Sequence, residues 1–292
     1  MSVWEAALLG VVQGLTEFLP ISSTAHLLVT RKLLGHPRID DAFTVVIQLG
    51  TLAAVFAYFR ADVARLARGL LLDLRRRTVG ATPDGRTAWL IVLGTVPAVA
   101  VGFTLKKWLK ETFFHLYPIA VVSVVFALLM LGSEWWAARR ARRGRAARGE
   151  SDVGWLDALW VGGWQAFALM PGGSRSGTTI TGGLFAGLSR PAAARFSFLL
   201  SLPVILGAGL KELYDEYKKL GSPVGGEPPS LFASGDEVAA LLVGTAVSAA
   251  VGYFAIAFLL RFLQRNTTAV FIAYRLLLGG TIFALLAAGV VN

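Results

Sequence analysis

A carboxylate, a hydroxyl and an imidazole lie close together near the start of the sequence. Gln13 and Glu17 are four residues apart, so they share one face of a helix. The proline-containing segment 18–21 follows, with Ser23 and His26 shortly after it. An ionisable side chain in apolar surroundings is costly unless it is paired or hydrated, so Glu17 is a functional candidate. Ser23 could serve as a nucleophile, and His26, about one helical turn later, as a proton carrier.

Each of these groups also has a structural interpretation. Glu17 could lie at an interface and face water, and Ser22 could do no more than cap the helix that follows Pro20. His26 could be a hydrogen-bonded packing residue. The gathering of these polar groups at one helix break favours the functional interpretation.

A second cluster surrounds Pro171. Glycines allow the backbone to approach a ligand closely, and the helix that follows presents unpaired N–H groups at its positive end. Arg175 offers a planar fork of donors that suits a phosphate. The alternative is ordinary turn chemistry, with the arginine facing lipid headgroups. We expect an anion site made by Gly172, Gly173, Ser174, Arg175, Ser176 and Thr178.

The composition places these clusters in a membrane protein. The chain has 292 residues, of which 55% are hydrophobic and only 16% are charged, whereas soluble domains carry about 25% charged residues. The absence of cysteine excludes disulfides, thiolate catalysis and Cys-ligated zinc. The net charge of +10 could suggest nucleic acid. Most arginines, however, lie in short loops between apolar runs, so we expect membrane lipids and no nucleic acid as partners.

The apolar runs give the predicted elements. Two stretches, 3–34 and 155–188, are broken in the middle by the two clusters. Each side of a break is a helix of about 15 residues, or about 22 Å, which is short of the roughly 30 Å hydrocarbon core. We therefore predict two re-entrant helix hairpins. Six further runs are long enough to span: 42–59, 88–105, 117–136, 196–213, 238–260 and 269–291.

The two halves of the chain resemble each other. Segment 94–103 parallels 244–253, and Pro20 and Pro171 fall at almost the same offset. Each half holds one hairpin and three spans, and because three is odd, the second half must be inverted in the membrane. The prediction is an all-α polytopic membrane protein with an inverted-topology repeat. It forms a single membrane domain, 1–292, with a first repeat at 1–138, a basic cytoplasmic linker at 139–153 and a second repeat at 154–292.

Loop charges predict the orientation. With the N-terminus outside, the arginine-rich segments 60–86 and 139–148 both become cytoplasmic, as the positive-inside rule requires. The acidic segment 212–237 and the C-terminus then lie outside. Hairpins that enter from opposite sides meet near the midplane. We therefore expect Glu17, Ser23 and His26 to face Arg175 across one cavity.

Segments 13–26 and 171–179 resemble the two signatures of the undecaprenyl-diphosphate phosphatase family associated with bacitracin resistance. The resemblance implies hydrolysis of undecaprenyl diphosphate to undecaprenyl phosphate and phosphate, which recycles the lipid carrier for cell-wall synthesis. It also implies the bacterial cytoplasmic membrane, with the active site facing the outer side. Two copies of such a chain could form a homodimer. The catalytic positions implied by the motifs are Glu17, Ser23, His26 and Arg175.

The resemblance further implies a divalent cation, Mg²⁺ or Ca²⁺, with Glu17 and Gln13 as ligands. Gln13 stands where the family often has Glu, which removes one carboxylate, and Ala25 stands where Gly is common. We expect Ser23 to attack the terminal phosphorus; the alternative is a water held by the cation, with Ser23 only positioning the substrate. A rival of another class is a polyprenyl-phosphate or anion transporter that uses the same cavity.

Overall fold

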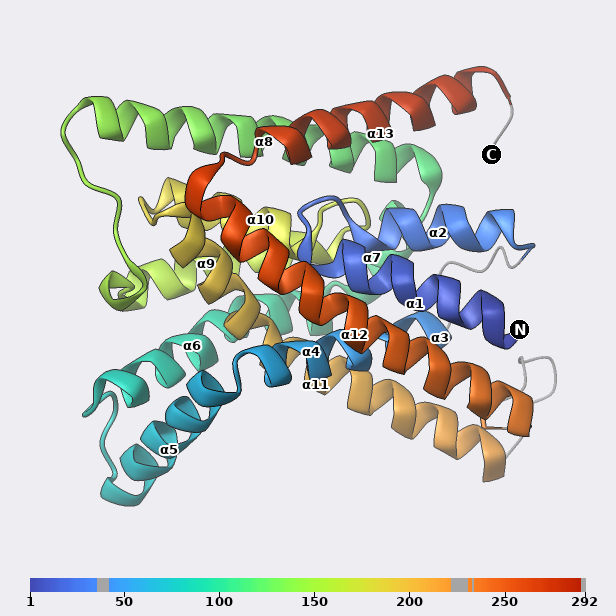
Figure 1. Cartoon of the computed structure of the whole chain (residues 1–292), viewed down its shortest axis with the longest axis horizontal. Helices are drawn as coiled ribbons and strands as arrows, with labels where there is room; N and C mark the ends of the chain where they lie inside the picture. Colours follow the sequence, from blue (N-terminus) through green and yellow to red (C-terminus); the bar gives the residue numbers. More distant parts are fainter. Residues whose placement is uncertain (36–41, 222–230, 233, 290–292) are drawn as a thin grey trace.

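The computed structural model describes residues 1–35, 42–221, 231–232 and 234–289. Within these ranges the regular structure is helical, apart from one isolated bridge between Arg148 and Leu188. The predicted all-α membrane class is confirmed. Parts of the acidic segment 212–237 and the last two residues of the final predicted span, 290–291, lie outside the described residues. The α-helices (Figure 1) are α1 (Val3–Phe18), α2 (Ser23–Leu33), α3 (Ala42–Val46), α4 (Gln48–Tyr58), α5 (Arg60–Arg76), α6 (Pro83–Thr104), α7 (Lys106–Phe113), α8 (Leu116–Arg142), α9 (Trp155–Ala166), α10 (Arg175–Phe185), α11 (Arg190–Gly221), α12 (Gly235–Arg265) and α13 (Ala269–Ala287).

Five helices are long and apolar enough to cross a membrane: α6, α8, α11, α12 and α13. The predicted span 42–59 is instead divided between α3 and α4, and the chain bends by 85° between α4 and α5. The bend falls where the apolar run ends at Phe59 and basic residues begin at Arg60. A sixth crossing therefore requires the bent pair to act as one span.

The two predicted hairpins are present, and they enter from opposite sides. In Figure 1, α1 and α2 run in from the side of the N-terminus, whereas α9 and α10 come from the other side, so that both breaks lie near the middle of the molecule. The hairpin bounds agree with the predicted stretches 3–34 and 155–188.

Each hairpin packs against a helix of the other half. A Cβ on Gly10 of α1 would lie 2.5 Å from the carbonyl oxygen of Gly244 on α12, and one on Gly162 of α9 would lie 2.2 Å from that of Gly94 on α6. The matching glycines of segments 94–103 and 244–253 thus serve equivalent helix crossings. In an inverted repeat, the hairpin of each half is expected to pack in the same way against the other half. These contacts support the predicted division of the chain, which stays a prediction.

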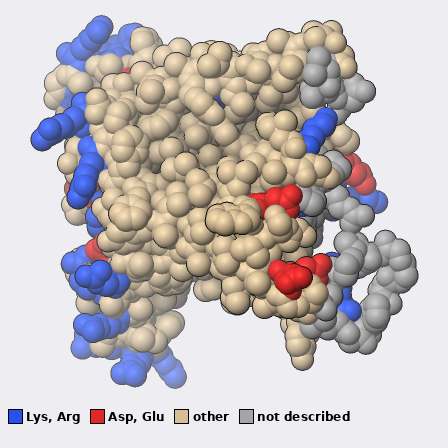
Figure 2. Space-filling model, turned by 45° about the vertical axis from the view of Figure 1, so that its right-hand side comes forward, with Lys and Arg blue, Asp and Glu red and all other residues tan. Residues whose placement is uncertain are grey.

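Charge separates the two ends of the molecule. The arginines that end α5 and α8 lie on the side away from the N-terminus, and Figure 2 shows Lys and Arg gathered along that edge. The N-terminus and the end of α13 share the opposite side (Figure 1). This distribution is the one on which the predicted orientation rests.

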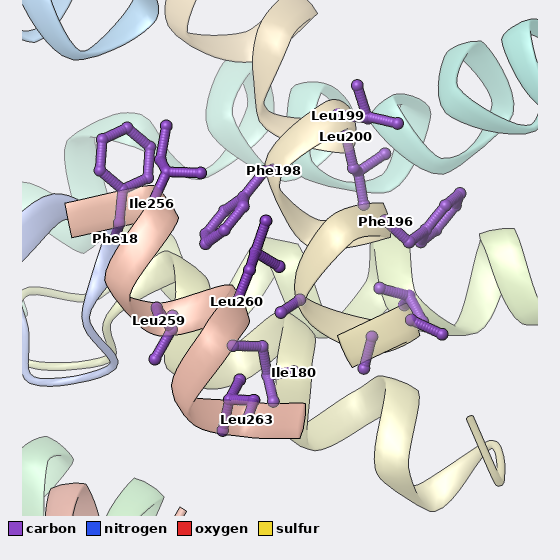
Figure 3. Close-up of a cluster of buried hydrophobic side chains, with 14 of the residues drawn as sticks. Phe18, Ile180, Phe196, Phe198, Leu199, Leu200, Ile256, Leu259, Leu260 and Leu263 are labelled. Carbon is purple, nitrogen blue, oxygen red and sulfur yellow. The ribbon is translucent and has the colours of Figure 1, made fainter. Parts of the chain in front are cut away.

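The main apolar core fixes the inner end of the first hairpin. Phe18, the last residue of α1, is fully buried and packs edge-on against Phe198 of α11, with ring centroids 5.3 Å apart. Ile256 and Leu260 of α12 complete this wall, which also includes Ile180 of α10 (Figure 3). Because Glu17 precedes Phe18 directly, this packing holds the carboxylate at the centre of the molecule.

Candidate active site

The two helix breaks have the same backbone conformation. Ser22 (φ 74°, ψ 97°) precedes α2, and Ser174 (φ 67°, ψ 112°) precedes α10. Apart from Arg77, these are the described non-glycine residues with positive φ. Side chains rarely adopt such angles, and they persist only where the surroundings enforce them. The reversal of each hairpin is therefore held in place by tertiary contacts.

Glu17 is the centre of a hydrogen-bond network that joins the hairpins. Its Oε2 accepts from Gln13 Nε2 at 3.0 Å and from Ser23 Oγ at 2.9 Å. Its Oε1 accepts from Arg175 Nη2 at 3.0 Å, and both side chains of this ion pair are nearly buried. The structure thus brings together the predicted carboxylate, hydroxyl and guanidinium from the two halves of the sequence.

This arrangement suits nucleophilic chemistry. A serine hydroxyl that donates to a carboxylate can pass its proton to that carboxylate when it attacks an electrophile. Arg175 donates to the same carboxylate through Nη2, and its Nη1 donates to the carbonyl oxygen of Ser197, at 3.4 Å. Its Nε is buried without a hydrogen-bond partner among the described residues. A donor is therefore available in the guanidinium for a phosphate oxygen.

His26 lies next to this network but makes no hydrogen bond to Ser23. Its Nδ1 lies 2.7 Å from the carbonyl oxygen of Ser22, and its Nε2 lies 2.6 Å from the hydroxyl of Tyr274 on α13. Since a carbonyl only accepts, Nδ1 carries a proton, and Nε2 of the neutral ring accepts from the tyrosine. The imidazole thus contacts a tyrosine that the sequence did not single out.

The polar groups of the second break are mostly engaged with one another. Ser174 Oγ accepts from the N–H of Gly177 at 3.2 Å and lies 3.3 Å from Ser176 Oγ. Thr178 Oγ1 donates to the carbonyl oxygen of Arg175. Gly172 has a φ of 94°, and a Cβ there would lie 2.6 Å from the carbonyl oxygen of Ile119.

These contacts shape the break, and they leave few donors for a ligand. The N–H groups of the first helical turn have no acceptor within the helix, and here only that of Gly177 is capped by a side chain. The N–H groups of Arg175 and Ser176 are therefore not capped by a side chain of the described residues. The predicted binding role of Gly172, Gly173 and the hydroxyl groups stays a prediction.

Arg275 is the residue that sequence reasoning missed. It lies on α13 with 1% exposure and donates to the carbonyl oxygens of Gly172 (2.7 Å), Gly173 (3.1 Å), Pro20 (3.4 Å) and Ser123 (3.3 Å). The signal was present, because Arg275 is the sole charged residue of the predicted span 269–291. A charge inside a membrane span is a functional candidate by the argument already applied to Glu17.

The side chains around Glu17 fit a divalent cation that would take some of its ligands from the protein and the others from water and the substrate. Gln13 Oε1 is buried without a hydrogen-bond partner, next to a carboxylate that accepts from three donors. No three described His, Asp or Glu side chains come together as a ready metal cage. Mg²⁺ typically takes one or two protein oxygens and completes its shell with water and phosphate oxygens. One carboxylate and one free amide oxygen match that pattern.

A separate cavity of about 440 Å³ lies away from this network. Its charged lining residues include Asp62, Arg65, Arg86, Glu150 and Arg195, and none of the residues of the Glu17 network contributes to it. The acidic groups of this cavity pair with arginines, as in the ion pairs of Arg195 with Asp62 and Glu150.

Comparison with known proteins shows the family of this chain. Residues 6–281 match the family described as "Bacitracin resistance protein BacA". The chain is 45% identical to an undecaprenyl-diphosphatase of Chlorobium phaeobacteroides (strain BS1), over 99% of both chains. It is 44% identical to the proteins of the same name from Prosthecochloris aestuarii, over 99% of both chains, and Chlorobium chlorochromatii, over 100% of both.

Proposed function

The chain belongs to the bacitracin resistance protein BacA family, and we propose that the Glu17 network is the site at which it hydrolyses undecaprenyl diphosphate. The products are undecaprenyl phosphate and phosphate, so the reaction recycles the lipid carrier of cell-wall synthesis and supports bacitracin resistance. Relatives that align over the whole chain are named undecaprenyl-diphosphatase, and the apolar helices place the enzyme in the membrane of its lipid substrate. The observation that carries the assignment of the site is the hydrogen bond from Ser23 to Glu17, with Arg175 on the same carboxylate.

In the proposed mechanism, Ser23 Oγ attacks the terminal phosphorus. The hydroxyl proton passes to Glu17 Oε2, which already accepts the hydrogen bond at 2.9 Å. A bond forms between Oγ and phosphorus, and the bond from phosphorus to the bridging oxygen breaks, which releases undecaprenyl phosphate. Water then attacks the phosphoserine and frees phosphate. Arg175 and the first N–H groups of α10 hold the phosphoryl oxygens on which charge develops.

His26 is proposed to carry protons for this reaction rather than to activate Ser23 directly. Its Nε2 contacts the Tyr274 hydroxyl, and Tyr274 is 41% exposed. The pair therefore connects the helix break to the outside of the fold. The remaining alternative is direct attack by water, with Ser23 only orienting the substrate. Capture of a phosphoserine at Ser23 after rapid acid quenching supports the covalent route, and its absence in an active preparation supports water.

Gln13 and Glu17 are proposed to hold Mg²⁺ or Ca²⁺. The cation would neutralise part of the diphosphate charge. Gln13 Nε2 and Ser23 Oγ both donate to Oε2 of Glu17, so the amide and the carboxylate lie next to each other. We further propose that the N- and C-termini lie outside and that the site opens to the outer side. The gathering of basic residues on the face opposite the N-terminus supports this orientation.

The decisive experiment measures phosphate release from undecaprenyl diphosphate by purified protein, with and without Mg²⁺ or Ca²⁺. Glu17→Ala and Arg175→Ala should each lose at least about 100-fold, equivalent to about 2.7 kcal/mol of barrier. Arg190→Met provides a matched control, since Arg190 also pairs with a carboxylate, that of Glu134. Folded wild-type protein that binds the lipid diphosphate without releasing phosphate would favour the transporter alternative.

A further inference from the structure

The buried guanidinium of Arg275 has no acidic partner among the residues that the structure describes. It is the largest fully buried side chain of the described structure. No described carboxylate lies within ion-pair distance of its guanidinium, whose hydrogen bonds to the described residues go to backbone carbonyl oxygens. Burial of an unneutralised charge opposes folding, and a membrane interior adds to this cost. A residue kept only for packing would be apolar.

The partners of Arg275 are the two helix breaks themselves. One guanidinium donates to Pro20 in the first break and to Gly172 and Gly173 in the second. A bond to the carbonyl oxygen of Ser123 ties the same side chain to α8. Arg275 therefore fixes the distance between the segment that carries Ser23 and the segment that carries Arg175.

Donation to these carbonyl groups also acts on the peptide N–H groups. The carbonyl of Gly173 belongs to the same peptide unit as the N–H of Ser174, at the start of α10. A cationic donor on the oxygen polarises that unit and strengthens its N–H as a donor. A Cβ on Gly177 would lie 3.0 Å from Arg275 Nη1, so the guanidinium lies against the first turn of α10. Its positive charge thus adds to that of Arg175 and of the helix N-terminus.

We propose that Arg275 is a positioning residue for the phosphatase reaction, which holds the two breaks in register and contributes an uncompensated positive charge behind the diphosphate. The proposal rests on the proposed function of the Glu17 network. It assigns Arg275 no contact with the reacting atoms. Arg275 then makes two contributions to the site. The geometric contribution needs the forked shape of the guanidinium, and the electrostatic contribution needs only its charge.

Two substitutions separate these contributions. Arg275→Lys keeps the charge and loses the fork, and Arg275→Gln loses both. The first measurement is inhibition by inorganic diphosphate, whose inhibition constant reports the charge. We expect it to rise at least about 10-fold in Arg275→Gln and less than about 3-fold in Arg275→Lys. The second is kcat, which reports the geometry and should fall at least about 10-fold in both variants.

Arg190→Met is the matched control. It removes another arginine that ties helices together, through Glu134, and should lower the thermal midpoint without changing the inhibition constant. A merely structural role of Arg275 predicts the same pattern for Arg275→Gln, and that result would overturn the proposal. If Arg275→Gln is not recovered as monodisperse protein, Arg275→Lys decides through kcat: a fall supports the proposal, and an unchanged value overturns it. Failure of the phosphatase assignment is recognised separately, because wild-type protein would then release no phosphate.

Discussion

Ser22 and Ser174 occupy the same position in the two hairpins: each has a positive φ, and each is the residue directly before the second helix. Only Ser174 uses its side chain as a cap, through the N–H of Gly177; Ser22 makes no such bond. Both breaks therefore hold a backbone conformation that a serine does not favour, next to the residues that carry the proposed chemistry. Strain of this kind is kept where a site needs a fixed geometry.

Substitution of each serine by glycine distinguishes the cost of backbone strain from the benefit of a side-chain cap. Ser22→Gly should raise the thermal midpoint in detergent, by an amount that corresponds to about 1 kcal/mol, because glycine accepts the positive φ and no cap is lost. Ser174→Gly should give less, since the bond to Gly177 disappears. A fall of the midpoint in Ser22→Gly, with Ser22→Ala unchanged, would contradict the strain interpretation.

The buried ion pair of Glu17 and Arg175 should show strong coupling in stability. Removal of one partner leaves a buried charge, and we expect Glu17→Gln or Arg175→Met alone to cost about 3–5 kcal/mol. The double variant should lose much less than the sum of the two. Chemical denaturation in detergent measures the coupling. Lys211→Met is a control, because its pair with Asp215 is exposed and should contribute less than about 1 kcal/mol. Additive losses would show that the two groups do not form a pair.

The unbonded amide oxygen of Gln13 lets us predict how a carboxylate at this position changes thermal stability with and without a divalent cation. Gln13→Glu adds a carboxylate beside Glu17, so the variant should be less stable than wild type without a divalent cation, because like charges repel. Addition of Mg²⁺ or Ca²⁺ should then raise its thermal midpoint more than that of wild type, since binding to the folded state stabilises it. Thermal melting over a cation series gives the result without an activity assay. An equal response of both proteins would exclude position 13 from the site.

The helix crossing of α9 with α6 offers a test by neighbouring glycines. Gly162→Ala should lower stability by about 1–3 kcal/mol, because the new methyl group collides with the backbone of Gly94. Gly163→Ala, one residue along, meets no atom within 4 Å and should be neutral or slightly stabilising. Thermal midpoints in detergent compare the two. Equal losses at both positions would show that the contact with Gly94 is not what makes Gly162→Ala destabilising.

Several features were predictable because they are local. The length of the apolar runs, the prolines that interrupt two of them and the glycines beside Arg175 predicted the membrane class and both hairpins. Glu17, Ser23 and Arg175 could be selected because charged or hydroxyl groups at a break in an apolar helix have few structural explanations. Arg275 obeys the same rule and was overlooked because no break marks its place in the chain.

The sequence by itself determined that this protein is a helical membrane protein with two polar breaks, since run length and helix-breaking residues act within one segment. The tertiary structure decided which groups meet: Ser23 with Glu17 rather than His26, His26 with Tyr274, and Arg275 with both breaks. It also decided the bend between α4 and α5. These contacts join residues far apart in the chain, and the free energy that selects them comes from packing of whole helices, such as Phe18 against Phe198, which no short segment records.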